Sequence, residues 1–252
     1  MNQKIVKDIA ASVRQRLLNR SKERREDFQL TLINFALERL MYRLSQSPYR
    51  DRFVLKGAML FSVWSETLHR ATRDLDLLGR DTHEVSDLVL QFREICATSV
   101  EDDGLMFFSK SIVGEEIREG DDYQGIRLSF EARLGVARIP IQVDIGFGDA
   151  VLPKPEILEY PTMLGFPAPR LLAYPRETVI AEKFQSMVEL GIANSRMKDF
   201  FDLWFLAGHF EFNGARLSPR LLSRLRKMAD KQGKPYQTLI HELLEKAASR
   251  VA

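Results

Sequence analysis

Four strand-like runs follow one another in the middle of the chain and limit its fold more than any other feature. The runs are Leu105 to Phe108, Ser111 to Ile117, Gln124 to Glu131 and Ile139 to Ile145, separated by glycine, aspartate and proline residues. Short runs with such boundaries predict strands rather than helices. The chain is therefore expected to fold as an α+β protein with a largely antiparallel or mixed sheet.

The remaining elements follow from the same spacing rules. Helices are expected over residues 3–19, 26–45, 58–67, 85–97, 176–190 and 197–208, and short strands at Arg52 to Leu55 and Asp74 to Leu78. The first two helices are expected to form a cap or a partner surface. Six prolines from Pro153 to Pro175 predict an extended linker that runs along the domain.

The composition argues against several classes of protein. Of the 252 residues, 45% are hydrophobic and 29% are charged, as in ordinary soluble proteins. No run approaches the roughly 18 apolar residues of a membrane helix, and the first residues lack the apolar core of a signal peptide. We therefore expect a cytoplasmic protein without membrane contact. Cys96 has no histidine or second cysteine at zinc-ligand spacing, so no zinc site is expected.

Basic residues gather near both ends, although the net charge is only +2. Local clusters of Lys and Arg, rather than net charge, give affinity for phosphate. The first cluster is Arg14, Arg16, Arg20, Lys22, Arg24 and Arg25, and the second is Arg216, Arg220, Arg224, Arg226, Lys227, Lys231 and Lys234. Each cluster fits either a nucleic-acid surface or an ordinary solvated helix face.

Asp74 and Asp76 are the first candidates for a chemical role. They lie two residues apart on an expected strand, so both carboxylates point to the same face. Two like charges this close are costly unless a cation lies between them. Mg²⁺ fits, because it binds through a few carboxylates and keeps positions for water and substrate phosphates. The alternative is a solvated strand edge without a metal.

A glycine turn and a third acid favour the metal site. Gly57 precedes an expected helix, and such a turn presents backbone N–H groups to a triphosphate. Asp144 lies on the last strand-like run, where its neighbours Val143 and Ile145 are expected to point into the core. Three acids on adjacent strands facing a glycine turn suit a metal-assisted in-line attack on an α-phosphate.

Several separated motifs resemble those of the AbiEii/AbiGii (MenT-like) nucleotidyltransferase toxins, a branch of the DNA polymerase β-like superfamily. The motifs are Lys56-Gly-Ala-Met-Leu, Arg70-Ala-Thr-Arg-Asp-Leu-Asp, Glu177-Thr-Val-Ile-Ala-Glu-Lys-Phe and Asn194-Ser-Arg-Met-Lys-Asp-Phe-Phe-Asp-Leu-Trp. They occur in the family's order and span roughly Arg52 to Trp204. The resemblance implies a polymerase β-like mixed sheet with flanking helices.

The resemblance also implies roles for individual residues. The metal ligands would be Asp74, Asp76 and Asp144, holding Mg²⁺ or, alternatively, Mn²⁺. The catalytic set would be Asp74, Asp76, Lys183, Asp199 and Asp202, and the nucleotide-binding set Lys56, Gly57, Thr72, Arg196 and Lys198. Asp199 and Asp202 also fit surface charges that pair along one helix. Trp204 and Phe205 are expected in the core.

The C-terminal segment resembles a ribbon-helix-helix module of the CopG/BrnA type. The resemblance covers Ala215 to Leu225 and Met228 to Leu244, with a glycine turn at Gly233. Such modules bind DNA as dimers, in which Arg216 and Ser218 would face bases in the major groove. The alternative is a terminal helical hairpin with an apolar face that includes Leu221 and Leu239.

Taken with the resemblance, the residues imply an enzyme that transfers a nucleoside monophosphate from an NTP to RNA. The expected acceptor is the 3′ end of tRNA, and a cognate antitoxin is an expected partner. The expected parts are N-terminal helices over 1–50, the nucleotidyltransferase core over 51–150, a linker and helical subdomain over 151–212 that completes the site, and an appendage over 213–252. Two alternatives are a DNA-binding regulator and a transferase that modifies a small molecule or protein.

Overall fold

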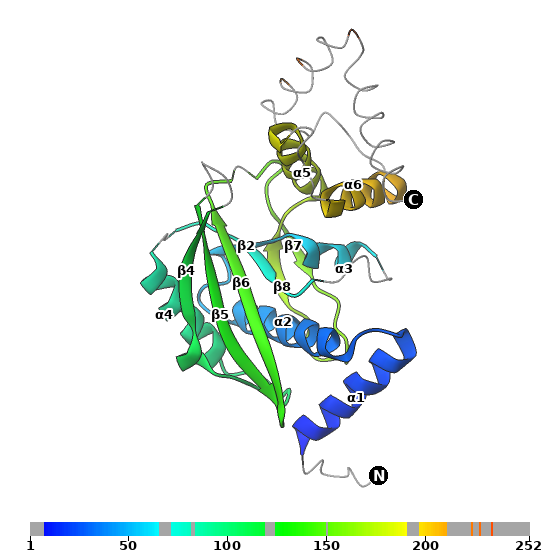
Figure 1. Ribbon diagram of the computed structural model, residues 1–252. Helices are drawn as coiled ribbons and strands as arrows, with labels where there is room; N and C mark the ends of the chain where they lie inside the picture. The colour runs from blue at the N-terminus through cyan, green and yellow to red at the C-terminus, as the bar shows by residue number, and fades with distance from the viewer. Residues whose placement is uncertain are drawn as a thin grey trace. The chain divides into compact units, whose positions relative to one another are not determined.

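The computed structural model describes residues 8–65, 72–81, 84–118, 124–149, 151–190 and 197–210, and the single positions 223, 227 and 233. They belong to two units (Figure 1). The first unit comprises Met1–Asp149 and Glu156–Ala173, and the second comprises Ala150–Pro155 and Tyr174–Ala252.

An eight-stranded mixed sheet forms the first unit, with strand order β3-β5-β6-β2-β1-β8-β7 and β4 beside β5. The strands are β1 Phe53–Lys56, β2 Leu75–Gly79, β3 Leu105–Phe107, β4 Val113–Arg118, β5 Gln124–Leu134, β6 Ala137–Phe147, β7 Glu156–Glu159 and β8 Arg170–Ala173. The pairs β2–β6 and β1–β8 are parallel, and the others are antiparallel. The expected α+β fold with a mixed sheet is confirmed.

The two faces of the sheet differ in chemistry. Alternate residues of β6, namely Ile139, Ile141, Val143 and Ile145, are at most 2% exposed. Helix α2 (Phe28–Gln46) packs on β6, and α4 (Val85–Ala97) packs on β4. Because side chains alternate along a strand, Gln142 and Asp144 point to the opposite face. Burial of the apolar residues of β6 therefore orients the acid of the same strand.

Helix α2 belongs to the core, which corrects the expectation that the N-terminal helices form a cap or partner surface. Its side chains Phe35, Leu37, Leu40 and Met41 are fully buried. They lie on different sides of the helix, which is typical of a helix enclosed by the protein. Asp27 caps its N-terminus by accepting a hydrogen bond from the Leu30 amide at 2.8 Å.

Helix α1 (Ile9–Arg24) uses part of its positive charge for structure. The guanidinium groups of Arg16 and Arg20 donate hydrogen bonds to the carbonyls of Leu164 and Met163. Lys22 remains exposed in the last turn of the helix. The first basic cluster thus divides into arginines that anchor α1 and residues that face solvent.

The proline-rich segment expected as a linker contains two strands of the sheet. Strand β8 pairs in parallel with β1 through Leu55 and Ala173, and β7 pairs with β8. The sequence reading missed them because each strand has only four residues and lies between prolines. The helix expected over 58–67 is a short turn, η1 (Ala58–Leu60), followed by α3 (Phe61–Trp64).

Buried charges join α2 to the loop before β3. Asp103, 1% exposed, accepts a hydrogen bond from Arg39 Nε at 3.0 Å. It also accepts two from the terminal nitrogens of Arg43, at 2.7 and 3.0 Å. Burial raises the pKa of Asp103, but the hydrogen bonds and charges of Arg43 and Arg39 outweigh it and lower the pKa. The Asp103 carboxylate is therefore held charged inside the first unit.

Glu38 lies beside this network with one oxygen unmatched. Its Oε2 accepts a hydrogen bond from the Met163 amide at 2.8 Å. Its Oε1 lies 3.8 Å from Arg39 Nη1 and has no hydrogen-bond partner among the residues the structure describes. Burial raises the pKa of Glu38 to about 7, although Met163 and Arg39 favour the charged form. The Glu38 carboxyl therefore titrates near neutral pH.

We expect Glu38→Gln to remove part of the pH dependence of stability. Since the folded pKa is raised to about 7, the stabilisation is fully present below the ordinary value of 4.5 and is lost as pH rises through 7. The shift corresponds to roughly 3 kcal/mol. Urea unfolding at acidic and mildly alkaline pH should show this loss in the wild type and not in Glu38→Gln. Parallel pH profiles of the two proteins would contradict it.

The second unit contains the two expected helices, α5 (Arg176–Leu190) and α6 (Met197–His209), and the structure shows that they pack on each other. Phe205 is 6% exposed and lies in the core, whereas Trp204 is 43% exposed and does not. Trp204 packs on Phe201 of the same helix instead, with ring centroids 5.7 Å apart. Among the described helices, none is long and apolar enough to cross a membrane. The C-terminal module expected over 213–252 lies outside the described ranges.

Candidate active site

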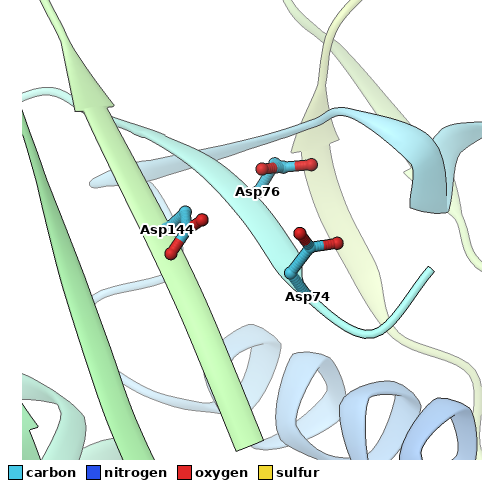
Figure 2. A group of neighbouring side chains, drawn as sticks. All are labelled: Asp74, Asp76 and Asp144. Atoms are coloured by element: carbon cyan, nitrogen blue, oxygen red, sulfur yellow. The ribbon is translucent and has the colours of Figure 1, made fainter. Parts of the chain in front are cut away.

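Three carboxylates meet on the face of the sheet opposite α2. Asp76 lies on β2 directly beside Asp144 on β6, and Asp74 immediately precedes β2 (Figure 2). All three side chains are half-buried, and one oxygen from each lies within 4.8 Å of the others. Such a set of hard oxygen donors fits Mg²⁺ or Mn²⁺ in charge and donor type. The structure therefore brings together the three acids that the sequence suggested.

The strand register extends this group into a row of charges across five strands. Directly opposed residues place Glu115 of β4, Arg127 of β5, Asp144 of β6, Asp76 of β2 and Lys56 of β1 side by side. Opposed residues of neighbouring strands point to the same face. The acids are therefore flanked by a cation on each side.

Two side chains, Arg127 and Gln142, hold the Asp144 carboxylate. Arg127 Nε donates to its Oδ1 and Arg127 Nη2 to its Oδ2, both at 2.8 Å. Gln142 Nε2 lies 3.4 and 3.2 Å from the same two oxygens. The hydrogen bonds and charge of Asp144 raise the pKa of Arg127. Arg127 and Asp144 thus form a fixed ion pair within the row.

The other two expected polar groups of the first unit also lie near the acids. Thr72 Oγ1 donates a short hydrogen bond to Asp74 Oδ1. Lys56 Nζ lies 2.9 Å from Asp149 Oδ2, and its side chain is 12% exposed. Thr72 therefore orients one acid, while Asp149 holds the cation at the end of the row.

The absence of a side chain at Gly57 leaves room for the Asp76 carboxylate. It adopts φ 71° and ψ −157°, which side chains rarely tolerate. A Cβ at this position would lie 1.9 Å from Asp76 Oδ2 and 2.5 Å from its Cγ. The expected turn before a helix is present, but the helix that follows is short, and the close approach to Asp76 is what requires glycine.

We expect Gly57→Ala to displace Asp76 and reduce nucleotidyl transfer at least about 100-fold. The backbone conformation should also lower the free energy of unfolding by roughly 1 to 3 kcal/mol. Transfer assays and urea unfolding measure the two effects. Gly135→Ala is the matched control, since Gly135 has φ 61° but its Cβ would come no nearer than 3.9 Å to Ala10. Similar activity in both variants would contradict the role of Gly57.

A second charged cluster lies in the second unit. Lys183 Nζ of α5 is 2.9 Å from Asp199 Oδ1 and 2.6 Å from Asp202 Oδ2 of α6. Asp202 is fully buried, and the Lys183 side chain is 12% exposed. The alternative in which these acids are surface charges is therefore wrong. Lys198 is exposed, and Arg196 lies outside the described ranges.

Sequence reasoning missed Arg127, Gln142 and Asp149. The signal for Arg127 was present in the hairpin between β5 and β6. Leu134 pairs with Ala137 across the turn residues Gly135 and Val136. Each further pair lies one residue earlier on β5 and one residue later on β6. Seven steps from this two-residue turn place Arg127 opposite Asp144. Recognising the turn would have predicted the ion pair.

Three carboxylates clustered on one face of a mixed sheet, beside a glycine turn, suit an enzyme of metal-assisted phosphoryl chemistry. The family described as "Nucleotidyl transferase AbiEii toxin, Type IV TA system" matches residues 39–251, and the chain belongs to this family. The match confirms the resemblance drawn from the motifs and extends it through the C-terminal segment. Membership implies an NTP substrate and a cognate antitoxin.

Comparison with curated proteins finds no match. Two solved structures from Helicobacter pylori are similar to the chain at low identity. JHP933 has 18% identity and a TM-score of 0.48, covering 86% of this chain and 94% of its own. A candidate nucleotidyltransferase has 17% identity and a TM-score of 0.49, covering 86% and 92% respectively.

Proposed function

We propose that this protein transfers a nucleoside monophosphate from an NTP to the 3′ end of tRNA, with Mg²⁺ as cofactor. The observation that carries the proposal is the meeting of Asp74, Asp76 and Asp144 on one face of the sheet in a chain of this family. The acceptor hydroxyl loses its proton to solvent and its oxygen bonds to the α-phosphorus, the bond from that phosphorus to the bridging oxygen breaks, and pyrophosphate leaves. The cognate antitoxin is the proposed protein partner, and the cytoplasm the proposed compartment.

Contacts within the first unit support a role for each of its proposed site residues. Asp74 and Asp76 would hold Mg²⁺, with Asp144 as the third candidate, and Thr72 orients Asp74. When bound, the ion neutralises phosphate charge and polarises the reacting phosphoryl group. Gly57 lets the backbone lie against Asp76. Lys56 supplies positive charge at the end of the charge row, beside Asp76.

Lys183 is the proposed phosphate ligand of the second unit. A lysine ammonium is a compact charge suited to phosphate, and two acids fix its position. Asp199 and Asp202 are therefore proposed to orient Lys183. Lys198 and Arg196 remain proposed nucleotide contacts on the strength of the family motif.

An RNA acceptor is supported by charge as well as by family. Lys22, Arg24 and Arg25 are exposed together at the end of α1. Clustered cations of this kind attract a phosphate backbone. Because Arg16 and Arg20 bind backbone carbonyls, the proposed RNA surface rests on Lys22, Arg24 and Arg25.

The test is transfer of label from each of the four α-labelled NTPs to total RNA and total protein, with Mg²⁺ present. We expect label in the tRNA fraction with wild type and none with Asp76→Asn. Periodate oxidation of the tRNA destroys its terminal diol and should abolish labelling. Label that persists on oxidised tRNA would exclude the 3′ end, and label found only in protein would exclude RNA as acceptor.

A further inference from the structure

Arg127 is a cation on the same face of the sheet as the three acids, and it has no role in the reaction proposed above. Two of its nitrogens, Nε and Nη2, bind Asp144. Its third, Nη1, makes no hydrogen bond within the described part of the chain, and its side chain is 34% exposed. We propose that Arg127 binds a phosphate group of the substrate and that Asp144 positions Arg127 rather than binding the metal. This inference rests on the proposed nucleotidyl transfer and deepens it.

The contacts of Asp144 argue against a place in the metal shell. A carboxylate offers about four acceptor positions, two on each oxygen. Arg127 and Gln142 together approach both oxygens, giving four contacts between 2.8 and 3.4 Å. A metal ion would have to displace a charged bidentate partner. Mg²⁺ is commonly held by one or two carboxylates plus substrate phosphates, so Asp74 and Asp76 suffice.

The charge of the site leads to the same assignment. Asp74, Asp76 and Asp144 bring three negative charges, and Arg127 neutralises one of them. The remaining two match a single divalent ion. Phosphates that enter with the substrate then need donors of their own. A guanidinium held at one edge by a carboxylate still presents Nη1 to a phosphate oxygen, which suits arginine better than lysine.

The position of Arg127 is fixed before any substrate arrives. Strand β5 is paired on both sides, with β4 and β6, at this residue. The bidentate contact with Asp144 restricts the side chain further. Much of the conformational entropy that phosphate binding would otherwise remove from a long side chain is therefore already lost on folding. This is the contribution we assign to Asp144.

The metal half of the proposal is tested by Mn²⁺ binding, followed by electron paramagnetic resonance of the free ion. The informative protein is the double variant Arg127→Met/Asp144→Asn, which removes the pair without changing the net charge. We expect its Mn²⁺ affinity to stay within about threefold of wild type, whereas Asp76→Asn should weaken binding at least about tenfold. A double variant as weak as Asp76→Asn would overturn the assignment of Asp144.

The phosphate half is tested by calorimetry with inorganic tripolyphosphate and, separately, with a short single-stranded RNA, both in Mg²⁺. Arg127→Met should weaken at least one ligand about tenfold or more, and Arg127→Lys should recover part of the loss. Loss of tripolyphosphate binding would identify the NTP as the source of the phosphate, and loss of RNA binding the acceptor. Unchanged binding of both ligands would overturn the role of Arg127.

Arg133→Met is the matched control for the phosphate test. Arg133 lies on the same strand, pairs with Glu131 at 2.8 Å and is 45% exposed. It lies six positions after Arg127, which corresponds to a distance of roughly 20 Å along the strand. We expect its variant to bind both ligands as wild type does. A loss equal to that of Arg127→Met would show a general charge effect and would count against the proposal.

Because binding measurements need no catalytic turnover, they test the role of Arg127 separately from the proposed nucleotidyl transfer. If the wild type labels no acceptor yet Arg127→Met weakens tripolyphosphate binding, the proposed transfer is wrong and the role of Arg127 stands. If the wild type labels tRNA and Arg127→Met binds both ligands normally, only the role of Arg127 is wrong. Thermal unfolding of each variant checks that the protein folds.

Discussion

Replacing Asp76 by Asn is expected to abolish nucleotidyl transfer, with a loss of at least about 1,000-fold. The side chain lies in the charge row between Asp144 and Lys56, and meets the backbone at Gly57. Asn keeps the shape of the side chain but removes the negative charge that a divalent ion requires. Transfer of label from NTP, together with Mn²⁺ binding, measures the effect.

Asp81→Asn is the control for this experiment. Asp81 lies just past the other end of β2, where it pairs with Arg52 at 3.2 Å, and its side chain is 55% exposed. An exposed pair of this kind contributes little to stability, so the variant should fold and transfer label as wild type does. Near-normal transfer by Asp76→Asn would show that the metal site has been wrongly assigned.

Asp103→Asn should be strongly destabilising, lowering the free energy of unfolding by about 3 to 5 kcal/mol. Arg39 and Arg43 would remain buried without the carboxylate that binds both of them. Such a loss is a large fraction of the stability of an ordinary domain. Urea unfolding at neutral pH, read by circular dichroism, measures it.

Asp102→Asn is the neighbouring control. Asp102 is exposed, and among the described residues its carboxylate accepts a hydrogen bond only from the nearby Gly104 amide. We expect a loss of about 1 kcal/mol or less. Because the pKa of Asp103 is lowered in the folded chain, its stabilisation should be present above the ordinary value of 3.8 and fall as pH drops through the folded value. Equal losses in the two variants would contradict the buried network.

Local patterns predicted much of the fold. The alternation in Ile139 to Ile145 placed its apolar side chains in the core and Asp144 on the other face, as the structure has it. Helix α4 has the bounds expected from its apolar spacing. Strands β7 and β8 were missed because the prolines around them predicted a linker, whereas β8 is held by pairing with β1 and β7 by pairing with β8.

The same distinction applies to buried charge. Nothing in the spacing of Glu38, Arg39 and Arg43 marks them as interior residues of α2. The burial of Arg39 and Arg43 depends on Asp103, which lies 60 residues further along the chain from Arg43. A charged side chain becomes tolerable in a core only when its partner is in place, and that partner comes from another segment.

The sequence by itself determined the family, through motifs in order, and the shared face of Asp74 and Asp76, through the two-residue period of a strand. Only the tertiary structure decided that Arg39 and Arg43 bind Asp103 in the interior and that Gly57 must be glycine beside Asp76. The physical reason is the range of the interactions. Strand period and motif order are local, whereas partners across strands depend on the register that the whole sheet adopts.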